Sequence, residues 1–168
     1  MKIAVSNPSV APHVRQTVTA YYEAGHLQQF YTTLFEHPEN YFSSQLKQIK
    51  AIRENIGRRS FHEIPIEKFC SRPLPELVRT ISSKKLGPRI TDRIWEWAEL
   101  SFDTWVSRKV SHELDAVHTY EHAALATLSE AKAKNVFCIY EQPSVHHTFF
   151  SSLVSQQLSL YPELLNSE

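Results

Sequence analysis

The sequence predicts an α/β protein with a Rossmann-like parallel sheet of about five strands and helices on both faces. Short apolar, β-branched and aromatic segments alternate with segments of helical spacing along the whole chain, which is typical of a parallel sheet. The length of 168 residues is near that of a common single domain, and 42% of the residues are hydrophobic, enough for a core. Neither a linker nor a repeat divides the chain, so residues 1–168 are expected to form one domain.

The first third of the chain predicts a strand–helix–strand unit. Residues 3–5 are apolar and predict a buried first strand, while the aromatic and β-branched residues 30–34 predict a second. Between them Val14 and Val18 recur at helical spacing, and Gly25 stands where that helix would end. Such a unit places its two strands parallel through a right-handed crossover.

The middle third is predicted to be mainly helical. Apolar side chains share one helical face over residues 42–56. Prolines precede a second helix at residues 76–83, and a long helix is expected over residues 91–106. Residues 61–64 alternate between apolar and polar and end at a proline, which predicts a short third strand.

The last third repeats the alternation of strands and helices. Residues 115–120 and 136–140 are predicted to be strands, each followed by a helix, at residues 122–134 and 148–158. With these two strands the sheet reaches about five.

Four residues of these elements are expected to be buried. Trp95, Trp97 and Trp105 fall on or beside the apolar stripe of the long helix, and aromatic residues at helical spacing usually pack in a core. Cys138 lies in the middle of an apolar strand and is expected to be an inert core residue.

The composition excludes several classes of protein. The 18 Lys and Arg balance the 18 Asp and Glu, so the chain lacks the basic field of a nucleic-acid-binding protein. Its three glycines form no P-loop or dinucleotide-binding loop, and its two cysteines are too few for a disulfide framework or a structural zinc site. There is neither an apolar run of about 18 residues nor a signal peptide. We therefore expect a cytoplasmic domain that needs no cofactor.

Five basic residues cluster around one predicted helix and form a modest positive patch: Lys47, Lys50, Arg53, Arg58 and Arg59. Such a run is usually a solvated face of a helix. The alternative is a peripheral contact with the anionic headgroups of a membrane.

Polar residues follow the first and the last two predicted strands, where ligands bind in an open parallel sheet. Three segments bring histidine, carboxylate and amide side chains to this edge: Asn7, His13, His118, Tyr120, Glu121, His122, Glu141, Gln142, His146 and His147. Such groups suit a binding cleft for a polyhydroxylated substrate, in which a histidine or a glutamate can act as a base. Two alternatives stay open, namely a metal site and a set of helix caps, although the spacing matches no recognised metal-ligand motif.

Three segments carry a resemblance to a known family: K-I-A-V-S-N-P, D-A-V-H-T-Y-E-H-A-A-L-A-T-L and V-F-C-I-Y-E-Q-P-S-V-H-H. Over nearly its whole length the chain resembles the amino-terminal domain of family 4 type retaining glycosyltransferases with the GT-B fold, found in bacteria, cyanobacteria included. The resemblance implies a histidine that faces the cleft near the transferred sugar. Two residues match that place: His118, which closes D-A-V-H, and Tyr120, where many members have a second histidine.

The resemblance implies an acceptor-side domain that works with a sugar acceptor and a nucleotide-sugar donor. His118 and Glu121 would be catalytic, and the other eight residues of the polar set would bind substrate. The family holds its donor in a C-terminal domain with an E-x7-E motif, which has no counterpart here, so the chain is expected to be inactive alone, as a fragment would be. The sheet edge left open would make the chain self-associate, or fold its C-terminal helix over the gap.

Two other functions compete with this one. A stand-alone α/β binding or regulatory module would use the same residues for a small polar ligand. A metal-dependent hydrolase would be built on the histidine cluster.

Overall fold

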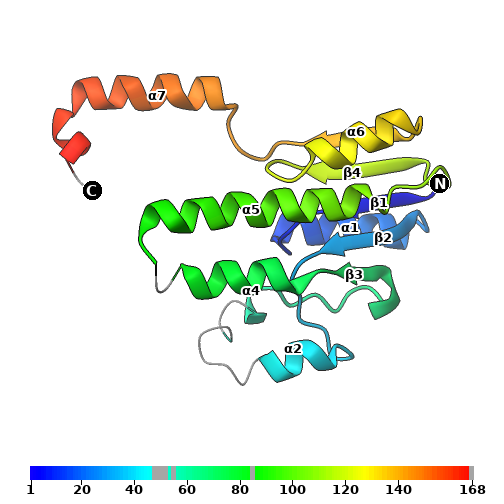
Figure 1. The fold of residues 1–168 in the computed structure, drawn as a ribbon. Coiled ribbons are helices and arrows are strands. Elements are labelled where there is room, and N and C mark those ends of the chain that lie inside the picture. The colour runs from blue at the N-terminus through cyan, green and yellow to red at the C-terminus, as the bar shows by residue number, and fades with distance from the viewer. Residues whose placement is uncertain (47–52, 54–55, 84–85, 167–168) are drawn as a thin grey trace.

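The computed structural model describes residues 1–46, 53, 56–83 and 86–166, and its core is a five-stranded sheet (Figure 1). The strands are β1 (Ile3–Ser6), β2 (Leu27–Thr32), β3 (Phe69–Ser71), β4 (Ala116–Tyr120) and β5 (Phe137–Glu141). All of them run parallel, in the order β3-β2-β1-β4-β5. The fold class that the sequence predicts is therefore confirmed.

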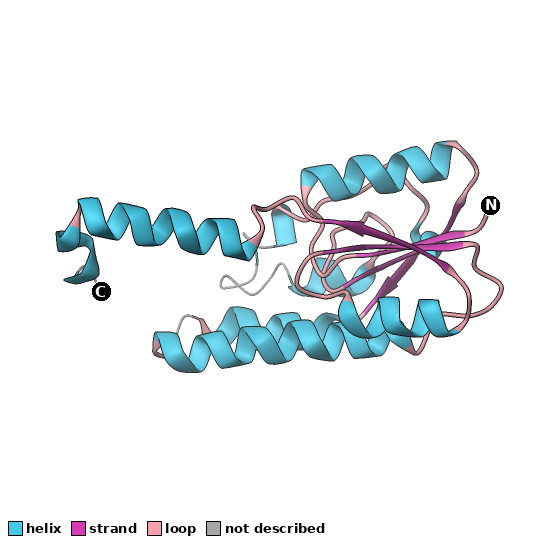
Figure 2. Ribbon diagram, turned by 90° about the horizontal axis from the view of Figure 1, so that it is seen from above, coloured by secondary structure: helices cyan, strands magenta, loops and turns pink. Residues whose placement is uncertain are grey.

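The helices lie on both faces of the sheet, as expected. They are α1 (Pro12–Glu23), α2 (Tyr41–Leu46), α4 (Pro73–Ser82), α5 (Pro88–Ser107), α6 (Leu125–Ala133) and α7 (His147–Leu160), with the 3-10 turns η1 (Ile66–Lys68) and η2 (Pro162–Asn166). Figure 2 shows the sheet edge-on, with α1 on one side and α5 and α6 on the other. Helix α4 packs against α5 rather than on the sheet itself.

The alternation of side chains along the central strands builds one core on each face of the sheet. Val5 packs with Val14 of α1 on one face, whereas Ala4 and Val117 pack with Phe102 of α5 on the other. Every residue of β1 and β4 is buried. Burial on both faces explains why three of the four residues of β1 are apolar, whereas β4 also buries the polar His118 and Thr119.

A carboxylate from α5 holds the start of α6. Asp103 is buried and accepts hydrogen bonds from the backbone N–H groups of Ala126 at 2.7 Å and Thr127 at 3.0 Å, and from the Thr127 hydroxyl at 2.6 Å. The first N–H groups of a helix have no partner within it. The N-cap residue of α6, Ala124, provides no side-chain cap. Asp103 therefore caps α6 from a different helix and fixes α5 beside it.

The third strand is β3 and not residues 61–64, so that prediction was wrong. Phe61 and Ile64 are fully buried, but they lie in a loop. Ser60, just before them, forms an isolated β-bridge with Glu36. The two apolar residues of this segment are three positions apart, which does not match the period of two of a strand, and both turn inward from a loop.

The expected burial of the tryptophans and of Cys138 was largely wrong. Trp95 and Trp97 are 45% and 48% exposed, while Trp105 is half-buried and meets Tyr31 edge-on at a centroid distance of 5.8 Å. The long helix α5 runs past the end of the sheet (Figure 2), so its first half has no strand behind it. Cys138 is exposed because β5 is an edge strand.

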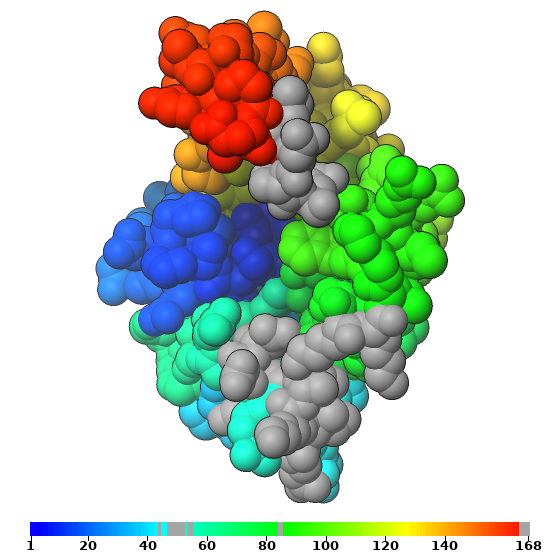
Figure 3. All heavy atoms as spheres, turned by 90° about the vertical axis from the view of Figure 1, so that its left-hand side faces the viewer, coloured from blue at the N-terminus to red at the C-terminus, as the bar shows by residue number. Residues whose placement is uncertain are grey.

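Helix α7 extends away from the body of the protein (Figure 1), and Figure 3 shows it from its end. None of its residues is buried, and five large apolar side chains on it are exposed: Phe149, Phe150, Leu153, Val154 and Leu160. The C-terminal helix thus does not cover the open edge at β5, and that expectation was wrong. Self-association through this edge stays a prediction.

The five residues of the expected basic patch do not share one solvated face. Arg59 is largely buried and donates to Glu76 at 2.6 Å, whereas Arg53 and Arg58 are exposed. Lys47 and Lys50 lie outside the described residues. Within the described ranges, no helix has both the length and the apolar character needed to cross a membrane.

Replacing Asp103 by alanine should lower the free energy of unfolding by about 3 kcal/mol, because it leaves the N-terminus of α6 uncapped and removes the shorter of the two hydrogen bonds of the buried Thr127 hydroxyl, whose other acceptor is the backbone carbonyl of residue 103. Urea unfolding of Asp103→Ala measures the change. The control Glu113→Ala removes an exposed carboxylate and should stay within about 0.5 kcal/mol of the wild type. Equal stabilities for the two variants would rule out the cap as a main support of α6.

Candidate functional site

A small polar hollow lies at the carboxyl ends of β1 and β4. Its volume is about 190 Å³. These two strands are neighbours in the sheet, and the chain turns to opposite sides of the sheet after each of them, so the hollow occupies the topological switch point. Five residues that the sequence places in the site line it: Asn7, His13, Tyr120, Glu121 and His122.

Other lining residues come from elements that sequence reasoning did not include. Arg79 of α4 and Glu99 of α5 reach the hollow, as do Pro8, Ser9 and Pro143 of the strand-end loops. Arg79 lies in the last turn of α4 and Glu99 in the middle of α5, so neither of them directly follows a strand. Their helical positions gave no signal, because only the packing of α4 and α5 brings them to this edge.

The loop after β1 is shaped by one asparagine. The side-chain oxygen of Asn7 accepts from the backbone N–H of Ser9 at 2.7 Å and from its hydroxyl at 3.1 Å. Helix α1 then begins without a side-chain cap at Ala11 and without an acidic residue in its first turn. Its free N–H groups and the positive end of its dipole therefore lie beside His13 and favour an anionic group there.

Arg79 is held in place by a buried carboxylate. Glu76 is 4% exposed and accepts from Arg79 Nη2 at 2.8 Å and from Arg59 Nη2 at 2.6 Å. Arg79 also lies over the ring of Trp95, 4.3 Å from its centroid. Burial lowers the pKa of Arg59, and the charge of Glu76 opposes that shift. The guanidinium of Arg79 thus meets the hollow in a fixed orientation.

Glu99 is a carboxyl group of the hollow whose pKa is shifted. Partial burial raises its pKa, against the effect of His122 and Arg79, whose positive charges lower it. It therefore keeps its proton to a higher pH than an ordinary glutamate does. With Glu121 it places two carboxyl groups in one small site, and carboxyl groups are among the side chains that act as acids and bases.

His118 lies behind the hollow and under α1. It is 6% exposed, and its Nδ1 is 3.2 Å from the hydroxyl of Tyr21. Its Nε2 approaches a carboxylate oxygen of Glu141 to 3.3 Å without the alignment of a hydrogen bond. Burial lowers the pKa of His118, more than the nearby Glu141 raises it, which favours the neutral imidazole.

Tyr120 forms the wall between His118 and the hollow. The two rings stack with centroids 4.9 Å apart, and His13 meets the other side of Tyr120 edge-on at 5.6 Å. Burial raises the pKa of Tyr120 to about 12, so its hydroxyl stays protonated at neutral pH. Among the described residues, that hydroxyl has no hydrogen-bond partner.

The turn after β4 places the side chains of Glu121 and His122 at the hollow. His122 has a φ of +75°, a left-handed conformation that is uncommon for a residue other than glycine. The helix expected over residues 122–134 therefore begins only at Leu125. The Nε2 atom of His122 lies 3.8 Å from Glu121 Oε1, and the hydroxyl of Ser144 donates to the other oxygen of Glu121.

Glu141 lies beside His118 and does not line the hollow, and three more residues of the predicted set lie away from it. Gln142 and His146 are exposed on the connection to α7, His147 is its exposed first residue, and the two histidine rings lie 4.3 Å apart. His146 accepts from the N–H of Thr148 at 3.3 Å and so caps α7. In the described part of the chain, no three His, Cys, Asp or Glu side chains are grouped so that they could hold a metal ion.

Replacing His118 by glutamine should remove part of the pH dependence of stability. Because burial lowers the pKa of His118 below 6.5, the unfolded chain binds this proton more readily, and stability is lost as the pH falls through 6.5. Above that pH the contribution is fully present. The free energy of unfolding, measured in urea between about pH 7.5 and about pH 5, should fall more steeply for the wild type than for His118→Gln.

The exposed His147 supplies the control for this comparison, since His147→Gln should keep the slope of the wild type. Parallel curves for the wild type and His118→Gln would contradict a neutral, buried His118.

Comparisons with family models, with curated proteins and with solved structures find no match to this chain.

Proposed function

We propose that this chain is the acceptor-side domain of a nucleotide-sugar-dependent glycosyltransferase, with the hollow at β1 and β4 as its half of the site. The observation that carries the proposal is the set of groups in that hollow: two carboxyls, two imidazoles and a guanidinium, from Glu99, Glu121, His13, His122 and Arg79. Carboxyls and imidazoles hydrogen-bond sugar hydroxyls and accept their protons, and a guanidinium pairs with phosphate.

The size of the hollow supports a shared site. Small-molecule sites usually measure about 300–1,000 Å³, whereas this one has about 190 Å³. A hollow of that size suits one wall of a cleft whose other wall carries the donor. The resemblance described above implies the same arrangement, with the nucleotide sugar bound by a second domain.

The proposed chemistry assigns a role to each carboxyl group. The acceptor hydroxyl oxygen bonds to the anomeric carbon as the bond from that carbon to the donor's diphosphate breaks. Glu121, oriented by Ser144 and close to His122, takes the hydroxyl proton. Glu99 is the second carboxyl group of the hollow and hydrogen-bonds a neighbouring hydroxyl group of the acceptor. Arg79 and the start of α1 stabilise negative charge on the leaving diphosphate.

His118 acts through its neighbour in this proposal. Because it is buried and stacked on Tyr120, it positions the wall of the hollow and does not touch the sugar. Gln142, His146 and His147 would meet the acceptor only outside the hollow, along the exposed connection to α7.

A stand-alone binding module for a small polar ligand is the second candidate. One observation favours it: every group that lines the hollow belongs to this one domain. Such a module would bind its ligand without a second protein domain, and titration with small saccharides and nucleotides separates the two functions.

Glu121→Gln should weaken saccharide binding about tenfold or more, because it replaces a charge-assisted hydrogen bond with a neutral one. Amide chemical shifts, recorded during titration with the methyl glycosides of glucose, galactose and mannose and separately with UDP, locate and quantify binding. We expect the glycosides to shift the amides of Asn7, His13 and His122. The exposed Glu113→Gln is the matched control and should bind as the wild type does.

Three outcomes decide between the two candidates. Weak glycoside binding that depends on Glu121 supports the acceptor-side domain. Tight binding of UDP or a glycoside by the isolated chain favours the stand-alone module. Shifts that avoid the hollow altogether overturn both.

A further inference from the structure

The exposed face of α4 carries apolar side chains, whereas a helix packed in a globular protein usually exposes polar ones. Helices usually bury their apolar face. Here Glu76 and Thr80 are buried, whereas Leu74, Val78 and Ile81 are 67%, 38% and 46% exposed. The three exposed residues recur at i, i+4 and i+7, so they form one continuous stripe along the helix.

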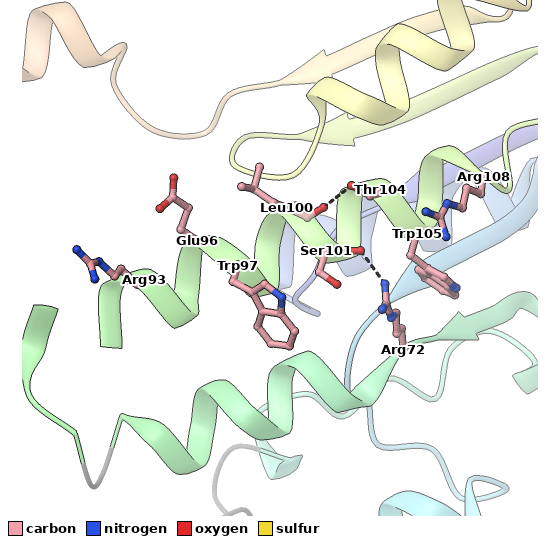
Figure 4. A pocket seen from close by; sticks show the side chains of 9 residues that line it. All are labelled: Arg72, Arg93, Glu96, Trp97, Leu100, Ser101, Thr104, Trp105 and Arg108. Atoms are coloured by element: carbon pink, nitrogen blue, oxygen red, sulfur yellow. Dashed lines mark hydrogen bonds between the residues drawn. The ribbon is translucent and has the colours of Figure 1, made fainter. Parts of the chain in front are cut away.

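Helix α5 continues this surface with a groove of about 560 Å³ (Figure 4). Trp97 extends from α5 toward α4 in that view, and Trp105 lies further along the same groove. Trp97 and Leu100 are 48% and 54% exposed. Arg72, at the start of α4, donates to the carbonyl oxygen of Ser101 at 2.7 Å and closes one side of the groove.

The two stripes belong to one side of the molecule. Helices α4 and α5 pack side by side (Figure 1), and the buried residues of α5 pack toward the sheet. Those of α4 face the body of the protein as well, since Glu76 meets Arg59. The apolar stripe of α4 and the groove residues of the adjacent α5 make up what we call the outer α4–α5 face: Leu74, Val78, Ile81, Trp97, Leu100, Arg72, Arg93 and Arg108.

The charge of this face is positive and spread out. Three arginines, Arg72, Arg93 and Arg108, line the groove against one carboxylate, that of Glu96. Arg93 and Arg108 are separated by about 22 Å along α5, at 1.5 Å per residue. A single small anion cannot reach both, so the spacing fits an array of anionic groups.

We infer that the outer α4–α5 face docks on a bilayer surface that contains anionic lipids. Tryptophan rings and aliphatic side chains enter the interface of a membrane while arginines meet the headgroups, and this face offers all three. A nucleic acid would satisfy the arginines but leave the aliphatic stripe of α4 in water. The site differs from the basic residues around Arg53 and Arg58, and the inference does not rest on the proposed function.

Vesicle sedimentation tests the inference with the whole chain. We expect binding to vesicles of phosphatidylcholine with about 30% phosphatidylglycerol, little binding to phosphatidylcholine alone, and a decrease with added salt. The double variant Arg93→Glu/Arg108→Glu should lower the partition coefficient at least about tenfold, since each arginine near the surface contributes attraction that reversal turns into repulsion. The emission of Trp97, compared with that of Trp97→Phe, should shift to the blue on binding.

Control variants keep the test specific. Arg58→Glu/Lys132→Glu changes the charge equally on exposed residues outside this face and should bind as the wild type does. Val78→Ser should weaken binding without changing the charge of the face. Equal binding to neutral and anionic vesicles, no binding to either, or equal losses for both double variants would overturn the inference. So would a change of oligomeric state in Val78→Ser, which would assign the face to a second copy of the chain.

Discussion

The buried carboxylate of Glu76 is the constraint on which the rest of the site depends. It bonds Arg59 at 2.6 Å and Arg79 at 2.8 Å, and Arg59 in turn reaches Thr33 at 3.1 Å and the carbonyl of Pro8 at 3.4 Å. Through these contacts the ends of β1 and β2 are joined to α4. Breaking a buried ion pair leaves one charge without its partner, typically at a cost of about 3–5 kcal/mol. The place of Arg79, and the course of the loop at Pro8, follow from this network.

Helix α5 links three otherwise separate features of the molecule. Asp103 on one side caps α6, Glu99 on another faces the hollow, and Trp97 lies on the outer face. A helix repeats its direction about every 3.6 residues, so side chains a few positions apart serve different neighbours. A shift of α5 would therefore alter the hollow and the outer face together.

The sequence contains enough to predict the sheet and half of the hollow. Period-two and period-3.6 patterns locate four of the five strands, and the rule for parallel sheets places Asn7 and Glu121 at the functional edge. The third strand was misplaced because the loop at Phe61 buries two apolar side chains, as a strand of the sheet would. The places of Arg79 and Glu99 in the hollow were not predicted, because they result from the packing of α4 against α5 and no local sequence pattern indicates that packing. The burial of Trp95 and Trp97 was predicted wrongly because α5 extends past the end of the sheet. The period of a sequence pattern does not show where a helix passes that end.

The separation of α7 from the body has a consequence for cooperativity. A helix of 14 residues that buries none of them draws little stability from tertiary packing, and isolated helices of this length are marginal in water. Its amide hydrogens should exchange with solvent by local fraying, while those of β1 and β4 exchange only on global unfolding. Far-UV circular dichroism would then register the melting of α7 before near-UV signals change. Because α7 and the sheet would then unfold separately, a single transition temperature describes only the unfolding of the sheet.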